Sequence, residues 1–165
     1  LVKSLGPLTR AESTARISLV VYSSLTLLAT AAAANAKGYL DSLGELTFVL
    51  LVAAAGLVVA HFWAAVLAKR LQDMQAPSGG WLRAEAIHSS SMFLPGLLLV
   101  GAAWAASLLV DDFEAAVTLG MCTLVVALFA YTWVGGGSED RRDDLLWALG
   151  TAAVGGLVVV FKVLI

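Results

Sequence analysis

The sequence predicts an all-α membrane protein, a bundle of five transmembrane helices in one domain over residues 1–165. The first reason is composition: 60% of the residues are hydrophobic, 13% are charged, and the mean hydropathy is +0.90. Soluble domains are typically about 45–50% apolar and about 25% charged. The second reason is that the chain contains five apolar runs, and a helix needs roughly 20 apolar residues to cross a bilayer. The predicted spans are residues 17–36, 44–67, 91–110, 115–134 and 145–165.

The first span carries polar residues four apart: Ser18, Tyr22, Thr26 and Thr30. This spacing draws a stripe along one side of a helix. Helices in lipid turn small and hydroxyl residues toward neighbouring helices, which predicts a packing face. The alternative is a hydrophilic pathway through the polar interior of the bundle.

The second span separates small from bulky side chains. Counting 100° per residue, the side of His61 carries Leu50, Ala54, Leu57, Ala64, Ala65 and Ala68. The opposite side carries Phe48, Val52, Val59, Trp63 and Val66. We expect the bulky side to meet lipid and His61 to point into the bundle or into a subunit interface.

The last three spans follow a polar segment, residues 69–90, in which Pro77, Gly79 and Gly80 indicate a loop. We expect a surface helix from Trp81 to His88 and then the third span. In the fifth span, Ala152 with Gly156 and Thr151 with Gly155 form two small-xxx-small pairs, which favour helix packing. Lys162, near the end of that span, is expected to snorkel to the head groups.

The distribution of basic residues predicts the orientation. The N-terminal arm and loops 69–90 and 135–144 lie on one side and hold eight of the ten Lys and Arg residues. Basic residues concentrate on the cytoplasmic side of membrane proteins. We therefore expect a multi-pass protein of the plasma membrane, with its N-terminus in the cytoplasm and its C-terminus outside.

His61 is the one ionisable side chain well inside a predicted span. Ionisable groups at membrane depth are costly, which makes them candidates for function. His61 would relay protons, ligate a metal or haem, or remain a neutral histidine bonded to a hydroxyl on a neighbouring helix. His88 and Glu85 precede the third span in the same half of the membrane, which allows a haem held by His61 and His88 or a metal site of His61, His88 and Glu85. The alternative for Glu85 is a solvated residue at the membrane–water interface with no role in binding.

Several function classes lack support in the sequence. The net charge of −2 offers no basic patch, so we expect no nucleic-acid partner. No Ser-His-Asp set, phosphate-binding glycine loop or HExxH motif is present in the sequence, so we expect no enzyme. With one cysteine, Cys122, no internal disulfide can form, and no cofactor is predicted.

Three segments together resemble a loosely defined set of small, uncharacterised actinobacterial integral membrane proteins: ESTARISLVVYSS, AHFWAAVLAKRL and FKVLI. In that set an Arg-x-x-x-x-x-Tyr start of the first span, a histidine late in the second and a lysine near the last residues recur. The matching residues here are Arg16, Tyr22, His61 and Lys162. The set has no established activity and implies no catalytic residues, but the resemblance adds weight to Tyr22, His61 and Lys162.

Three hypotheses about function follow. The first is a non-enzymatic subunit or accessory factor of a membrane complex, or a homo-oligomer, with the lipid bilayer and other membrane subunits or itself as partners. The second is a small channel or transporter for protons, ions or a small hydrophobic molecule, using His61 and the polar stripe. The third is a haem- or metal-binding membrane protein.

Overall fold

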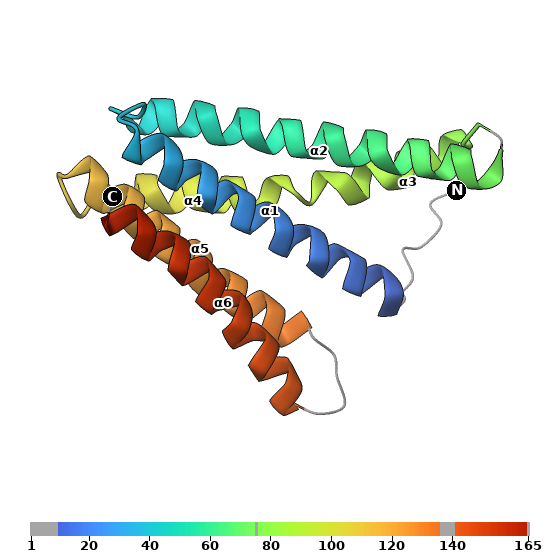
Figure 1. Cartoon of the computed structure of the whole chain (residues 1–165). Helices are drawn as coiled ribbons and strands as arrows, with labels where there is room; N and C mark the ends of the chain where they lie inside the picture. Colours follow the sequence, from blue (N-terminus) through green and yellow to red (C-terminus); the bar gives the residue numbers. More distant parts are fainter. Residues whose placement is uncertain (1–9, 75, 136–140, 165) are drawn as a thin grey trace.

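A computed structural model describes residues 10–74, 76–135 and 141–164, and within them the chain is entirely α-helical (Figure 1). The helices are α1 (Arg10–Ala36), α2 (Leu43–Asp73), α3 (Gly79–Ser90), α4 (Phe93–Ala106), α5 (Phe113–Gly135) and α6 (Arg141–Leu164). Among these residues, five segments are long and apolar enough to cross a membrane, and α3 and α4 together form the third. The predicted fold class is confirmed.

Helix α2 is longer than the predicted span. Its 31 residues extend to Asp73, whereas the sequence predicts an end at Leu67. At 1.5 Å per residue the helix is about 46 Å long and exceeds the roughly 30 Å hydrocarbon core. The extension is charged, and Lys69 Nζ lies 2.8 Å from Asp73 Oδ2 one turn later. Such pairs stabilise exposed helices, which explains why the helix continues past Leu67. It ends at Met74, whose φ of 54° is left-handed.

Pro95 explains why the third crossing segment consists of two helices. A proline in a helix cannot donate to the carbonyl four residues earlier, and its ring clashes with that carbonyl. The carbonyl in question belongs to Ser91, and the break between α3 and α4 falls at residues 91–92. Here Leu94 N donates to Ser91 O over a shorter turn. The predicted helix from Trp81 to His88 is present as α3. The apolar helical segment that contains it runs from Gly79 to Ala106, whereas the sequence predicts a span over 91–110.

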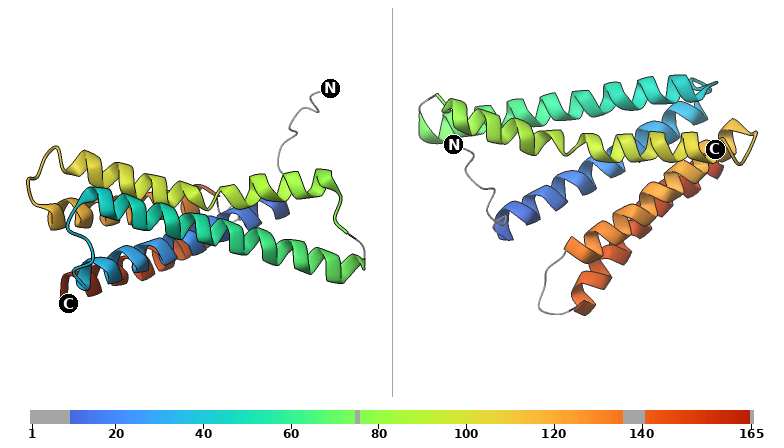
Figure 2. Two further views of the ribbon diagram at one scale, coloured as in Figure 1. Left: turned by 90° about the horizontal axis from the view of Figure 1, so that it is seen from above. Right: turned by 180° about the vertical axis from the view of Figure 1, so that it is seen from behind.

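Helix α1 lies between the other helices and contacts α2, α4, α5 and α6. Figures 1 and 2 show that the helices converge at the end where α1 and α6 finish. Toward the opposite end, α2 and α3 diverge from α5 and α6. The core lies in the converging part and consists mainly of Leu, Ala and Val from α1, α2, α4 and α5. Trp104 Nε1 donates to Thr47 Oγ1 at 3.1 Å and joins α4 to α2 there.

Glycines allow the closest helix contacts. A Cβ added to Gly120 of α5 would lie 3.0 Å from Ala103 Cβ and 3.1 Å from Leu99 O of α4. In α6, a Cβ on Gly155 would lie 3.1 Å from Val125 Cγ2 of α5. Gly156 has open space instead, with no such atom within 4 Å. Of the two small-residue pairs predicted for α6, the one containing Gly155 therefore lies at a helix contact within the chain.

We predict that Gly120→Ala destabilises the protein by about 1–3 kcal/mol, because α4 and α5 must move apart. Alanine favours a helix over glycine by only about 0.5–1 kcal/mol and does not offset this cost. Reversible unfolding in mixed micelles measures the difference. Gly101→Ala in α4 is the matched control, since its Cβ meets nothing within 4 Å. Equal stability of the two variants would contradict the close contact.

Candidate functional site

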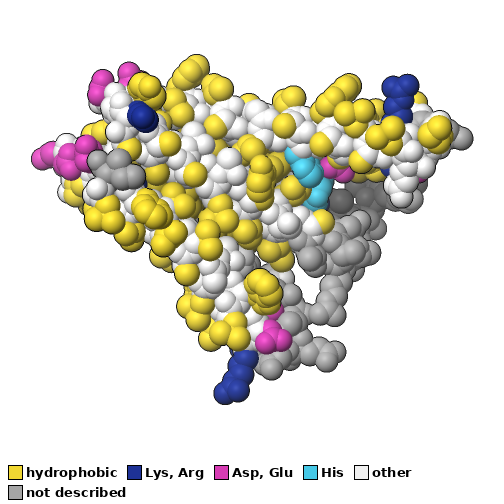
Figure 3. All heavy atoms as spheres, in the orientation of Figure 1, with side chains coloured by type: hydrophobic (Ala, Val, Ile, Leu, Met, Phe, Trp, Pro, Cys, Tyr) yellow, Lys and Arg dark blue, Asp and Glu magenta, His cyan; other side chains and the backbone are white. Residues whose placement is uncertain are grey.

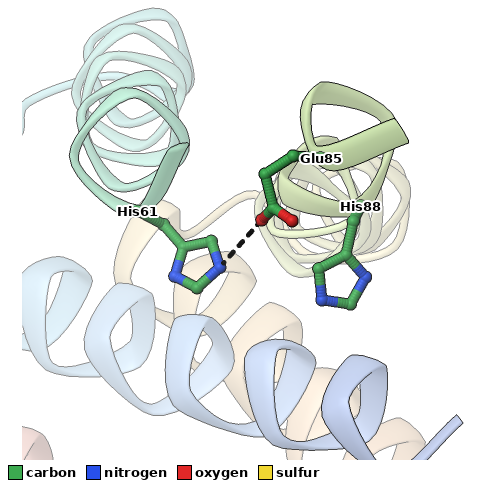
Figure 4. A group of neighbouring side chains, drawn as sticks. All are labelled: His61, Glu85 and His88. Atoms are coloured by element: carbon green, nitrogen blue, oxygen red, sulfur yellow. Dashed lines mark ion pairs between the residues drawn. The ribbon is translucent and has the colours of Figure 1, made fainter. Parts of the chain in front are cut away.

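Helices α2 and α3 bring His61, Glu85 and His88 together (Figure 4). His61 Nε2 lies 3.6 Å from Glu85 Oε1, and the centroids of the two imidazole rings are 6.3 Å apart. One ligand atom from each of the three residues lies within 4.8 Å of the others. The neighbour of His61 on the adjacent helix is thus a carboxylate. The alternative of a neutral histidine bonded to a hydroxyl predicted a Ser, Thr or Tyr there.

The local sequence explains the grouping. Glu85 and His88 are three residues apart, so they lie on the same face of α3. A short connection turns the chain back after α2, and α3 packs against α2. On α2, Leu50 and Ala54 on the His61 side are buried. Phe48, Val52, Val59 and Trp63 on the opposite side are exposed, as the sequence predicts. His61 therefore faces α3.

Ser89 supports the carboxylate. It is fully buried, one turn after Glu85, and its Oγ donates to Glu85 Oε1 at 3.4 Å. The sequence interpretation did not single out Ser89, although the spacing of four from Glu85 was a usable signal. The next two serines are occupied elsewhere: Ser90 Oγ and Ser91 Oγ donate to the carbonyls of Ile87 and His88, each at 2.7 Å. Of these three serines, Ser89 is therefore the one that bonds to Glu85.

The site is partly exposed and lies toward the end of α2 that is far from Leu43. The side chain of His61 is 33% exposed and that of Glu85 is 16% exposed. His61 is 18 residues beyond Leu43, about 27 Å along α2, which is close to the roughly 30 Å thickness of the core. In Figure 3 a histidine side chain is visible at the surface of the molecule.

Two imidazoles and one carboxylate are a donor set used for Zn²⁺ and other divalent first-row metals. In tetrahedral sites with bonds of about 2.0–2.2 Å, ligand atoms lie roughly 3.4 Å apart, so the three groups would close by about 1 Å around an ion. Three protein ligands leave a further position for water or a substrate. The carboxylate of Glu85 projects between the two rings (Figure 4), where a haem would have to lie. The arrangement favours a single ion over a haem.

The polar stripe of α1 does not form the interior of the chain. Ser18 and Tyr22 are exposed, Tyr22 by 58%, and Thr26 and Thr30 are half-buried. The two threonine hydroxyls donate to carbonyls of their own helix, each at 2.9 Å. The packing face lies on the other side of α1 and consists of Ser23, Ser24, Leu27, Leu28 and Ala31. Within the chain, the side of α1 that packs is therefore not the predicted stripe. Hydroxyls on both sides of α1 bond to carbonyls of their own helix, so their polarity does not indicate which side packs.

Lys162 is held within the bundle. It is only 8% exposed, and its Nζ donates to Thr118 Oγ1 of α5 at 2.9 Å. That this side chain reaches the head groups stays a prediction.

Comparison with protein-family models, with curated proteins and with solved structures finds no match to this chain. The resemblance to actinobacterial membrane proteins thus gains no support from these comparisons. The chain is a multi-pass membrane protein by the length and composition of its five crossing segments.

We predict that Ser23→Leu destabilises the protein, whereas Ser18→Leu does not. Ser23 is fully buried, so a leucine there overpacks the core and costs about 1–3 kcal/mol. Ser18 is exposed, and the same change is expected to stay within about 0.5 kcal/mol. Unfolding midpoints in the same detergent compare the two variants. Greater damage from Ser18→Leu would restore the polar stripe as the packing face.

Proposed function

We propose that this protein is a non-enzymatic, multi-pass membrane protein that binds a divalent transition-metal ion through His61, Glu85 and His88. One observation carries the proposal: ligand atoms of these three residues lie within 4.8 Å of one another. We therefore favour metal binding over the broader hypothesis of a membrane subunit that binds no ligand. Zn²⁺ is the ion that we would test first, because imidazole and carboxylate donors suit it.

The surroundings support binding of an ion. Ligand residues of metal sites are usually held by outer hydrogen bonds, and Ser89 holds Glu85 in this way. The ligands come from two helices joined by a short connection, so a bound ion would fix α2 against α3. A metal-dependent change in this end of the bundle would signal to a membrane partner or a second copy. We therefore place the protein as a metal-responsive accessory factor, with its N-terminus and the metal site on the cytoplasmic side.

Proton or ion transport is the second candidate. It is favoured by the 3.6 Å contact between His61 and Glu85, with the His88 ring beside them, which would serve as a proton relay. The stripe on α1 adds nothing to this candidate within one chain, because Ser18 and Tyr22 are exposed.

We predict that the purified protein binds one Zn²⁺ and that His61→Ala, Glu85→Gln and His88→Ala each weaken binding by at least about 100-fold, above the 10- to 100-fold typical of outer partners. Isothermal titration with elemental analysis measures affinity and stoichiometry. Zn²⁺ should also raise the unfolding temperature of the wild type, since it binds only the folded chain.

Asp73→Asn is the matched control for Glu85→Gln, because Asp73 is a carboxylate of α2, the helix that carries His61, and lies outside the cluster. Equal Zn²⁺ binding by all variants would refute the site. A metal-free protein that conducts protons in liposomes, and loses this flux with His61→Ala, would establish the transport candidate instead.

We further predict that Ser89→Ala lowers Zn²⁺ affinity by about 10- to 100-fold while leaving one ion bound, since it removes an outer partner and no ligand. Competition against a chelator of known affinity measures the change. Ser90→Ala is the control, because that hydroxyl donates to the carbonyl of Ile87. Equal effects of the two changes would show that damage to the helix break, rather than release of Glu85, lowers the affinity.

A further inference from the structure

A polar pocket of about 470 Å³ lies at the end of the bundle opposite the histidine cluster. Its lining comes from the end of α1, the start of α5 and the end of α6, and includes Asn35, Asp112, Glu114, Thr118 and Lys162. Its volume is within the range of small-molecule sites, about 300–1,000 Å³.

Lys162 is the unusual member of this lining. It is more than nine-tenths buried, with bonds to Thr118 Oγ1 at 2.9 Å and to the carbonyl of Glu114 at 3.5 Å. Within the described ranges, no carboxylate oxygen lies within 4.0 Å of its Nζ. An ammonium group has three donors, and a buried charge without a counter-ion is costly. Lys162 therefore offers a cationic position to an anionic group entering the pocket.

The pocket also carries negative charge. Asp112 and Glu114 both line it, and both are exposed. One oxygen of Asp112 accepts from the amide of Ala115 at 3.1 Å, which caps the start of α5. With one lysine and two carboxylates, the lining has a net charge of −1, which disfavours a simple anion. A ligand that combines an anionic group with a protonated amine matches both Lys162 and the two carboxylates.

The pocket lies at the level of lipid head groups. Lys162 is 21 residues beyond Arg141, about 32 Å along α6, which is close to the roughly 30 Å thickness of the hydrocarbon core. With Arg141 at one edge of the core, Lys162 lies at the other. This placement holds for either orientation of the chain in the membrane.

We propose that this pocket binds the head group of a phospholipid with a primary amine, of the phosphatidylethanolamine type. The phosphate faces Lys162, and the ammonium faces Glu114 and Asp112. Phosphatidylcholine matches less well because its quaternary ammonium has no N–H to donate, and phosphatidylglycerol has no cation for the carboxylates. This site is separate from the metal site, and the proposal does not depend on metal binding.

Native mass spectrometry of the purified protein, delipidated and then incubated with one lipid at a time, tests the proposal. We expect phosphatidylethanolamine to be retained over phosphatidylcholine and phosphatidylglycerol. Lys162→Met should weaken that retention about 10- to 100-fold, the range for loss of a charge-assisted hydrogen bond. Lys69→Met is the matched control, because Lys69 pairs with Asp73 near the other end of the bundle and should retain lipid as the wild type does.

Glu114→Gln is a second variant, which distinguishes loss of the site from misfolding of Lys162→Met. It removes the carboxylate but keeps the carbonyl that accepts from Lys162, so it should lose the preference for phosphatidylethanolamine and gain affinity for phosphatidylglycerol. A misfolded protein would lose both lipids. Soluble glycerophosphoethanolamine should compete with the lipid, and inorganic phosphate should not. Equal retention of all three lipids, wild-type binding by Lys162→Met, or equal competition by phosphate would overturn the proposal.

Discussion

Hydrocarbon offers no hydrogen-bond partners, so every backbone amide and carbonyl inside a membrane must find its partner within the protein. Helices meet this constraint except where a residue interrupts them. Pro95 is such a residue, and the chain responds with a shorter turn at Ser91 and with two serine hydroxyls on the carbonyls of Ile87 and His88. The break separates α3 from α4, and α3 carries Glu85 and His88 to the face of α2.

Hydrocarbon around the helices also weakens the hydrophobic contribution to packing between them. Lipid tails are as apolar as leucine, so burying apolar side chains gains little, and close fit must hold the helices together. Gly120 against Ala103 and Gly155 against Val125 provide that fit between α4, α5 and α6. The hydroxyls of α1 lie on both of its sides and bond to carbonyls of their own helix. Ser23 and Ser24 do so on the buried side, and Thr26 and Thr30 do so on the half-buried side.

Two polar groupings lie near opposite ends of the bundle. The cluster of His61, Glu85 and His88 lies where the helices diverge, and the pocket around Lys162 lies where they converge. The first grouping is rich in metal-ligating atoms, and the second balances one cation against two carboxylates. Their chemistry therefore suits different ligands.

The sequence alone determined the all-α class and the five crossing segments, because the length of an apolar run and the thickness of a bilayer are independent of how helices meet. It also determined which side of α2 carries bulky residues, since helical spacing fixes the sides of an isolated helix. Only the tertiary structure decided which neighbour each side meets. The distance between His61 and Glu85 depends on the pairing of α2 with α3, and the burial of Lys162 depends on the approach of α5 to α6. The side of α1 that packs was likewise unpredictable, because a hydroxyl satisfied by its own helix leaves no signal of where the next helix lies.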